Sequence, residues 1–66
     1  MNKHALSAIY CHELRELMIE SGSTYRVPEA IAKTVESTKD TRFVKNWAAL
    51  NQLIPSDGQV GYFEAA

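Results

Sequence analysis

The chain has 66 residues, of which 45% are hydrophobic and 23% charged, with only three Gly and two Pro. This composition is typical of a globular chain rather than a disordered or collagen-like one, and the length suffices for a single domain with one small core. Seven Lys and Arg against eight Asp and Glu give a formal charge of −1, which counts against nonspecific attraction to nucleic acid or to anionic membranes.

Cysteine usage and apolar run lengths indicate where the protein works. Cys11 is the only cysteine, so the chain has no internal disulfide framework and no Cys pair for zinc, which favours a reducing compartment. No apolar run approaches the roughly 20 residues that span a bilayer, and the first residues lack the pattern of a signal peptide. We therefore expect a cytoplasmic protein without a membrane partner.

Residues 3–20 contain neither Gly nor Pro, and Asn2 stands where a helix N-cap would satisfy the free amides of a first turn. On a helical projection, the apolar side chains of this segment gather in one arc of roughly 140°, the width of a core-facing stripe. We therefore predict a supporting N-terminal helix. Its expected buried stripe consists of Leu6, Tyr10, Cys11, Leu14, Leu17 and Met18.

A second, shorter helix is predicted after a chain reversal at residues 21–23, where Gly22 suits the left-handed conformation of a helix end. Pro28 is tolerated in a first helical turn because its missing amide would have no partner there. The body of this helix, residues 29–37, places Ile31 and Val35 on one side, and we expect that side to face the core.

A third helix is predicted over residues 41–54, and it ends before Pro55 because the residue preceding a proline is pushed away from helical geometry. Asp40 or Thr41 is the expected N-cap. The main apolar residues of this helix project within about 60° of one another. We therefore expect a core-facing stripe of Phe43, Trp47, Leu50 and Ile54, with Val44 beside it.

The C-terminal segment begins with Ser-Asp-Gly at residues 56–58, which is typical of a turn, and the Val, Tyr and Phe that follow favour a short extended segment. The expected fold is mainly α: a small three-helix domain with a helix-turn-helix-like pair and a short C-terminal β segment or hairpin. We predict one domain over residues 1–66, made of a supporting helix (1–22), the helix-turn-helix-like pair (25–54) and a wing or tail (55–66).

Several motifs follow one another in a familiar order: VPEAIA at residues 27–32, a polar segment from Ser37, Val44 with Trp47, and a proline leading to an Asp-Gly turn. This order resembles the winged helix-turn-helix of excisionase-like and MerR-like DNA-binding domains, and the resemblance covers residues 25–65. It implies a small regulator of phage-like compactness that binds double-stranded DNA and acts in transcription regulation without chemistry of its own.

The outer side of the third predicted helix carries groups suited to DNA. Thr41 and Asn46 can hydrogen-bond in a major groove, and Arg42 and Lys45 can reach guanine edges or phosphates. Lys39 and other flanking groups would hold the backbone. The complete set of expected DNA-binding residues is Arg26, Lys39, Thr41, Arg42, Lys45, Asn46 and Gln59. The alternative is that the basic side chains only solvate the outer face of a core helix.

A larger protein is the alternative partner, which this chain would inhibit or adapt. The near-neutral charge, the acidic first segment and two isoleucines outside its apolar arc favour this hypothesis. The candidate partner-binding residues are Ile9, Glu13, Glu16 and Ile19. The same isoleucines would equally serve a homodimer, or they are ordinary surface residues.

Patterns for catalysis and metal binding are missing from the sequence. It contains no Gly-rich phosphate loop and no Ser-His-Asp pattern, and the spacing of His4, Cys11 and His12 does not bring them together as zinc ligands. We therefore expect no enzymatic activity, no metal, no cofactor and no small-molecule substrate.

Overall fold

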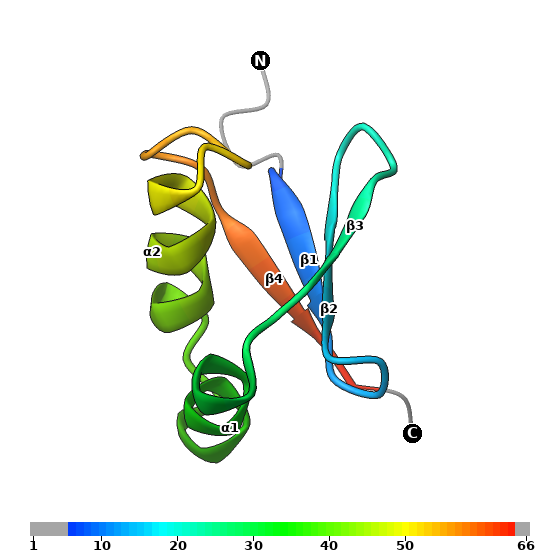
Figure 1. The fold of residues 1–66 in the computed structure, drawn as a ribbon, viewed down its shortest axis with the longest axis vertical. Helices are drawn as coiled ribbons and strands as arrows, with labels where there is room; N and C mark the ends of the chain where they lie inside the picture. The colour runs from blue at the N-terminus through cyan, green and yellow to red at the C-terminus, as the bar shows by residue number, and fades with distance from the viewer. Residues whose placement is uncertain (1–5, 65–66) are drawn as a thin grey trace.

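The computed structural model describes residues 6–64, which form a four-stranded mixed sheet and two helices (Figure 1). Strand order is β3-β2-β1-β4; β1, β2 and β3 pair antiparallel, and β4 runs parallel to β1. The chain leaves the sheet at the β3 edge, forms both helices and returns at the other edge as β4. The elements are β1 Ala8–Cys11, β2 Glu16–Ile19, β3 Thr24–Arg26, α1 Glu29–Thr38, α2 Arg42–Leu50 and β4 Val60–Phe63.

The predicted fold class, mainly α with three helices, is wrong. The N-terminal helix predicted over residues 3–20 is instead a β hairpin, in which β1 and β2 are joined by residues 12–15. Asn2, His4 and the first expected turn of that helix lie outside the described residues. The hairpin turn closes because Arg15 adopts a left-handed conformation, with φ of 51°, and its N–H donates to the His12 carbonyl at 3.3 Å.

Strand alternation explains why this segment gains more from pairing than from a helix. Tyr10 and Leu17 lie opposite each other in the register and are fully buried on the side of the helices. Ile9 and Met18, the next pair, point to the other face. A helix would have placed Leu14 beside Leu17, whereas the structure leaves Leu14 exposed in the turn.

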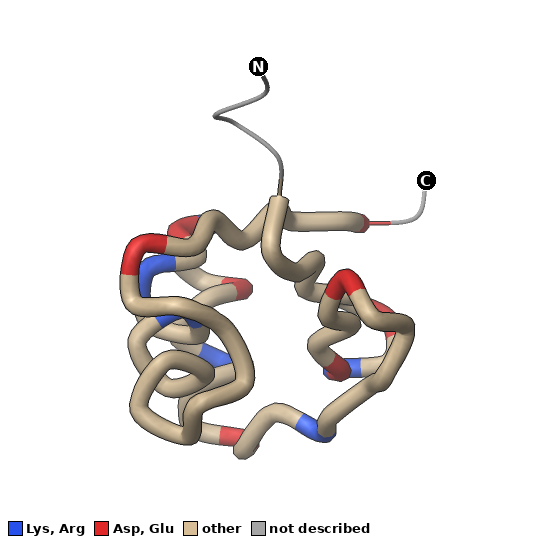
Figure 2. The backbone as a smooth tube through the Cα atoms, turned by 90° about the horizontal axis from the view of Figure 1, so that it is seen from above, with Lys and Arg blue, Asp and Glu red and all other residues tan. Residues whose placement is uncertain are grey.

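The two shorter predicted helices are confirmed as α1 and α2. Pro28 precedes α1 directly, and the helix ends at Lys39, whose left-handed backbone (φ of 59°) lets its N–H reach the Val35 carbonyl at 2.7 Å. The N-cap of α2 is Thr41, which makes no side-chain cap hydrogen bond; the carboxylate of the preceding residue, Asp40, accepts the Arg42 N–H at 2.9 Å. Figure 2 marks the Lys, Arg, Asp and Glu positions on the backbone, where blue segments lie close to red ones.

The predicted orientation and length of the last helix need correction. α2 ends at Leu50 rather than at residue 54, because Gln52 turns left-handed (φ of 61°) and directs Ile54 back into the core. Phe43 and Leu50 were expected to be buried but are 44% and 84% exposed. The small residues Val44 and Ala48 face the sheet instead, which lets the helix approach it closely.

The C-terminal extended segment is confirmed as β4, an edge strand of the main sheet. Thr41 at the start of α2 donates its hydroxyl to the Val60 carbonyl at 2.9 Å and so ties the helix layer to the outer edge of β4. The turn before β4 packs closely on the start of β1, since a Cβ on Gly58 would lie 2.6 Å from the Ser7 hydroxyl. β4 therefore completes the sheet beside β1.

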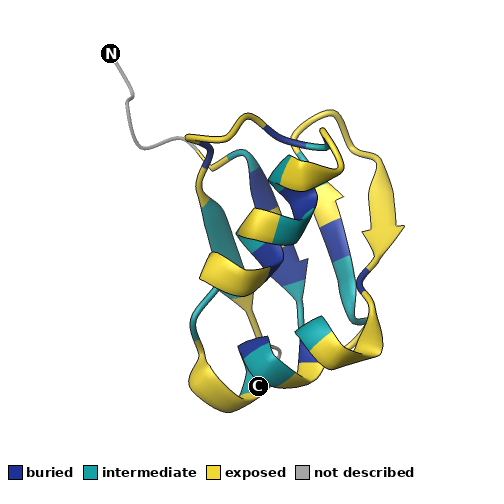
Figure 3. Cartoon of the chain, turned by 60° about the vertical axis from the view of Figure 1, so that its left-hand side comes forward, coloured by how far each residue is buried: buried dark blue, intermediate teal, exposed yellow. Residues whose placement is uncertain are grey.

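The hydrophobic core lies between the helices and one face of the sheet, and Figure 3 marks the buried positions on both layers. Aromatic side chains contribute to it, because the rings of Tyr10 and Tyr62 pack at a centroid distance of 5.6 Å. Neither helix in the described part of the chain is long and apolar enough to cross a bilayer. The core residues are Ala8, Tyr10, Leu17, Val27, Ala32, Val35, Val44, Ala48 and Ile54.

The observed orientation of α2 predicts a contrast between two truncations. Val44→Ala should lower the free energy of unfolding by about 2 kcal/mol, because it removes buried methyl groups and leaves a cavity. Leu50→Ala should change it by less than about 0.5 kcal/mol, because that side chain is in solvent. Urea denaturation followed by Trp47 fluorescence measures both, and a larger loss for Leu50→Ala would contradict this orientation of the helix.

Candidate functional site

In the described part of the chain, the helices cover only one face of the sheet. The opposite face, called here the open face, is formed by side chains of alternating strand positions and by Leu6. Four of its apolar side chains are between 38% and 55% exposed. Leu6 crosses β4 at Gly61, where a Cβ would lie 2.9 Å from the Leu6 Cδ1, so the glycine makes room for it. These apolar residues are Leu6, Ile9, Met18 and Phe63.

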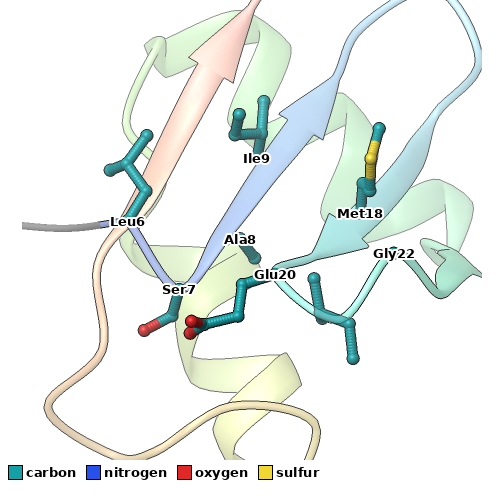
Figure 4. Close-up of a pocket in the computed structure, with 8 residues that line it drawn as sticks. Leu6, Ser7, Ala8, Ile9, Met18, Glu20 and Gly22 are labelled. Carbon is teal, nitrogen blue, oxygen red and sulfur yellow. The ribbon is translucent and has the colours of Figure 1, made fainter.

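A shallow hollow of about 250 Å³ lies at the end of the open face where β1 begins and β2 ends. Leu6, Ile9 and Met18 project on one side of it, and Ser7 and the Glu20 carboxylate lie together on the other (Figure 4). Its lining is therefore mainly apolar, with one carboxylate available to orient a ligand.

The residues expected to bind a protein partner are partly brought together. Ile9 and Glu16 occupy the same face of the hairpin, since their register partners are Met18 and Cys11. Glu13 lies in the hairpin turn. Ile19 points to the opposite side and packs partly buried against the core, and it also borders the hollow. Sequence reasoning missed Leu6, Met18 and Phe63 as open-face residues. A period-two reading of Glu16–Ile19 separates Met18 from the core residue Leu17, and the same reading of Val60–Phe63 separates Phe63 from Tyr62, but Leu6 precedes β1 and has no such signal.

Three of the residues expected to contact DNA are engaged within the protein. The Lys39 ammonium lies 3.4 Å from a Glu64 carboxylate oxygen and 5.3 Å from the centre of the Tyr62 ring. Arg42 pairs with Asp40 at 2.7 Å, and the Thr41 hydroxyl is used by the Val60 carbonyl.

The remaining expected DNA contacts lie on separate elements. Arg26 belongs to the edge strand β3, and Gln59 precedes β4 at the other edge of the sheet. Lys45 and Asn46 are on α2, where Lys45 is half-buried and Asn46 exposed. Arg26 and Lys45 have no ion-pair partner among residues 6–64.

A polar network joins the hairpin turn to α1. Glu36 accepts hydrogen bonds from the Tyr10 hydroxyl at 2.7 Å and from two nitrogens of Arg15 at 2.9 and 3.0 Å. The Arg15 guanidinium and the Tyr10 hydroxyl hold the pKa of the Glu36 carboxyl at about 2. Burial, together with the neighbouring Glu36 carboxylate, raises the pKa of Tyr10 well above its usual range.

A second polar group surrounds Tyr62 at the ends of β1 and β4. Its hydroxyl is 2.9 Å from His12 Nδ1, and His12 is 4.0 Å from Glu64. No buried side-chain nitrogen or oxygen in the described residues lacks a hydrogen-bond partner. Because these groups satisfy one another, we interpret both networks as structural: the first joins the hairpin turn to α1, and the second joins the ends of β1 and β4.

Two further results bear on function. Among residues 6–64, no three His, Cys, Asp or Glu side chains gather where a metal ion could be held. Comparisons with protein-family models, with curated proteins and with solved structures find no match for this chain.

The Glu36 network predicts a specific pH dependence. Glu36→Gln should cost about 1–3 kcal/mol at pH 7, because the Arg15 guanidinium loses its charged partner. The pKa of Glu36 falls from 4.5 to about 2 on folding, so its contribution is complete above pH 4.5 and is lost as the pH falls towards 2. The stability curves of wild type and Glu36→Gln, measured by urea denaturation, should therefore converge below pH 4.5. A gap that stays constant down to pH 2 would contradict the network.

Proposed function

We propose that this protein is a small non-catalytic interaction module that inhibits or adapts a larger protein by binding it through the open face. The observation that carries the proposal is the cluster of Leu6, Ile9, Met18 and Phe63, all exposed on one side of the sheet. Contiguous apolar side chains in water are unfavourable, and on a protein surface they mark sites where another molecule binds.

The architecture strengthens this interpretation. An antiparallel sheet with one solvated face ordinarily alternates apolar and polar residues, so that the outer face is polar. Here Ile9 and Met18, which pair at the centre of the sheet, are both apolar on the outer side. Glu16, Thr24 and Arg26 supply polar groups around them, as at the rim of a protein interface.

Protein binding accounts for the geometry better than DNA binding does. Lys39 and Arg42 already pair with carboxylates of the chain, and the described residues carry more acidic than basic groups. Phosphate contacts require available cations, and repulsion from the acidic groups lowers affinity for DNA. The free thiol of Cys11 fits a reducing cytoplasm, which we propose as the location.

Site-specific photocrosslinking tests the function. A photoreactive amino acid at Met18, on the open face, should capture a protein from cells that produce this chain, and the same group at Lys33, on the helix layer, should not. The captured protein, once identified and purified, should bind the wild-type chain, and Ile9→Lys should weaken that binding by at least about tenfold. Equal capture from both positions, or unchanged affinity of Ile9→Lys, would refute the proposal.

Ile19→Lys is a matched comparison that separates binding from folding. Ile19 packs against the core, so a lysine there should lower the free energy of unfolding by several kcal/mol. Ile9→Lys, on the open face, should leave the free energy of unfolding within about 1 kcal/mol of wild type. If both variants unfold equally easily, the assignment of the two isoleucines to opposite faces is wrong.

A further inference from the structure

Charge is distributed unevenly between the two sides of the sheet. Three acidic residues belong to the β1–β2 hairpin: one in its turn, one on β2 and one directly after β2. None of them has an ion-pair partner among residues 6–64. We call Glu13, Glu16 and Glu20 the hairpin acids. The only basic residue on the open face of the described strands is Arg26, which lies opposite Glu16 in the register.

The rest of the described charges balance, with five basic and five acidic residues, most of them in ion pairs. The negative charge of the described residues is therefore concentrated around the open face. Partners that bring positive charge to this rim gain attraction, and partners that bring negative charge are repelled. The balanced residues are Arg15, Lys33, Lys39, Arg42 and Lys45 with Glu29, Glu36, Asp40, Asp57 and Glu64.

The dimensions of the open face suit a single helix. Four strands at a spacing of about 4.8 Å and four residues at about 3.3 Å each give a surface of roughly 14 by 14 Å. An α-helix is about 10 Å wide with its side chains, and three turns of it are about 16 Å long. One amphipathic helix would cover the face and complete a layer arrangement with helices on both sides of the sheet.

From this charge and shape we propose that the open face binds a basic amphipathic helix of the partner protein, with one large apolar side chain in the hollow and Lys or Arg side chains beside Glu16 and Glu20. The inference rests on the proposed function and names the chemistry of the partner. The hollow lies between Leu6, Ile9 and Met18, and Glu20 lines it, so an apolar anchor and a cation fit side by side.

A second copy of this chain fits the same face less well. In a two-fold dimer the same patch meets itself, so two faces with the same net negative charge would meet. A helix with a complementary charge avoids the repulsion.

The test uses two synthetic helical peptides about three turns long, both with Leu at positions i, i+3, i+4 and i+7. One has Lys at the remaining positions and the other has Glu. Fluorescence anisotropy should give an affinity for the wild-type chain that is at least about tenfold higher for the Leu/Lys peptide than for the Leu/Glu peptide. The Glu16→Lys/Glu20→Lys double variant should reverse that order.

A charge-matched variant distinguishes the effect of charge on the open face from the effect of the net charge of the whole chain. Glu29→Lys/Asp57→Lys changes the net charge by the same amount at positions away from the open face, and it should keep the preference for Leu/Lys. Met18→Lys should weaken the binding of the Leu/Lys peptide. A Leu/Lys peptide with a scrambled sequence should bind the wild-type chain weakly, because it has no apolar stripe. The thiol of Cys11, on the open face beside Phe63, should react more slowly with a maleimide when the peptide is bound.

Three outcomes would overturn the inference: equal affinity for the two peptides, a reversal by Glu29→Lys/Asp57→Lys as large as that by Glu16→Lys/Glu20→Lys, or equal affinity for the scrambled peptide. Self-association in sedimentation that Met18→Lys abolishes, without peptide binding, would assign the face to a second copy instead. If the Leu/Lys peptide does not bind while the photocrosslink at Met18 identifies a protein partner, the proposed function is supported and the proposal of a basic amphipathic helix is wrong.

Discussion

The structure depends on one constraint: a four-stranded sheet has two faces, and the described chain supplies two short helices, which cover one of them. On that side, Val44 and Ala48 keep α2 close to the sheet, and Tyr10 and Leu17 fill the space beneath the helices. The other face receives no helix, yet Ile9, Met18 and Phe63 keep it apolar. The strands carry apolar side chains on both faces, but the helices cover only one face, and this difference is the reason to expect a partner.

The contact between Glu36 and the hairpin joins the helix layer to the sheet. Arg15 holds the Glu36 carboxylate with two nitrogens while its own backbone is left-handed, and its carbonyl accepts the Val27 N–H at 3.0 Å. One residue of a tight turn therefore fixes the position of α1 and the start of the segment that leads into it. This leaves the open face free of structural polar contacts, because the network lies among the side chains between the layers.

Local signals predicted the helices well and the hairpin not at all. Pro28 and Asp40 mark helix starts by mechanisms that act within one turn, so α1 and α2 are recognisable without tertiary information. The hairpin turn, His-Glu-Leu-Arg, contains no Gly, Asn or Pro, and three of its four residues, Glu, Leu and Arg, favour helices. The alternation of the strands is hidden because Ile9 and Met18 are apolar on the outer side as well. The residues that form the candidate binding face are thus the ones that conceal its secondary structure.

The orientation of α2 could not be predicted from its own sequence. Phe43, Trp47 and Leu50 form the most hydrophobic stripe of the helix, and the preference for burying such a stripe would turn it inward. The structure buries Val44 and Ala48 instead, leaves Phe43 and Leu50 exposed, and packs Trp47 partly buried against the core. Which face of a helix is buried depends on the volume of the surface opposite, which is a property of the assembled fold.

The parallel pairing of β4 with β1 sets the order in which the molecule can assemble. The contact of His12, which follows β1, with Tyr62 on β4 joins residues 50 positions apart, whereas the hairpin pairs residues that are close in sequence. Closing such a long loop costs chain entropy before any contact compensates for it, so pairing of this kind is slow. Until β4 pairs, β1 has an unpaired edge next to the exposed Ile9, and an unpaired edge of this kind favours aggregation.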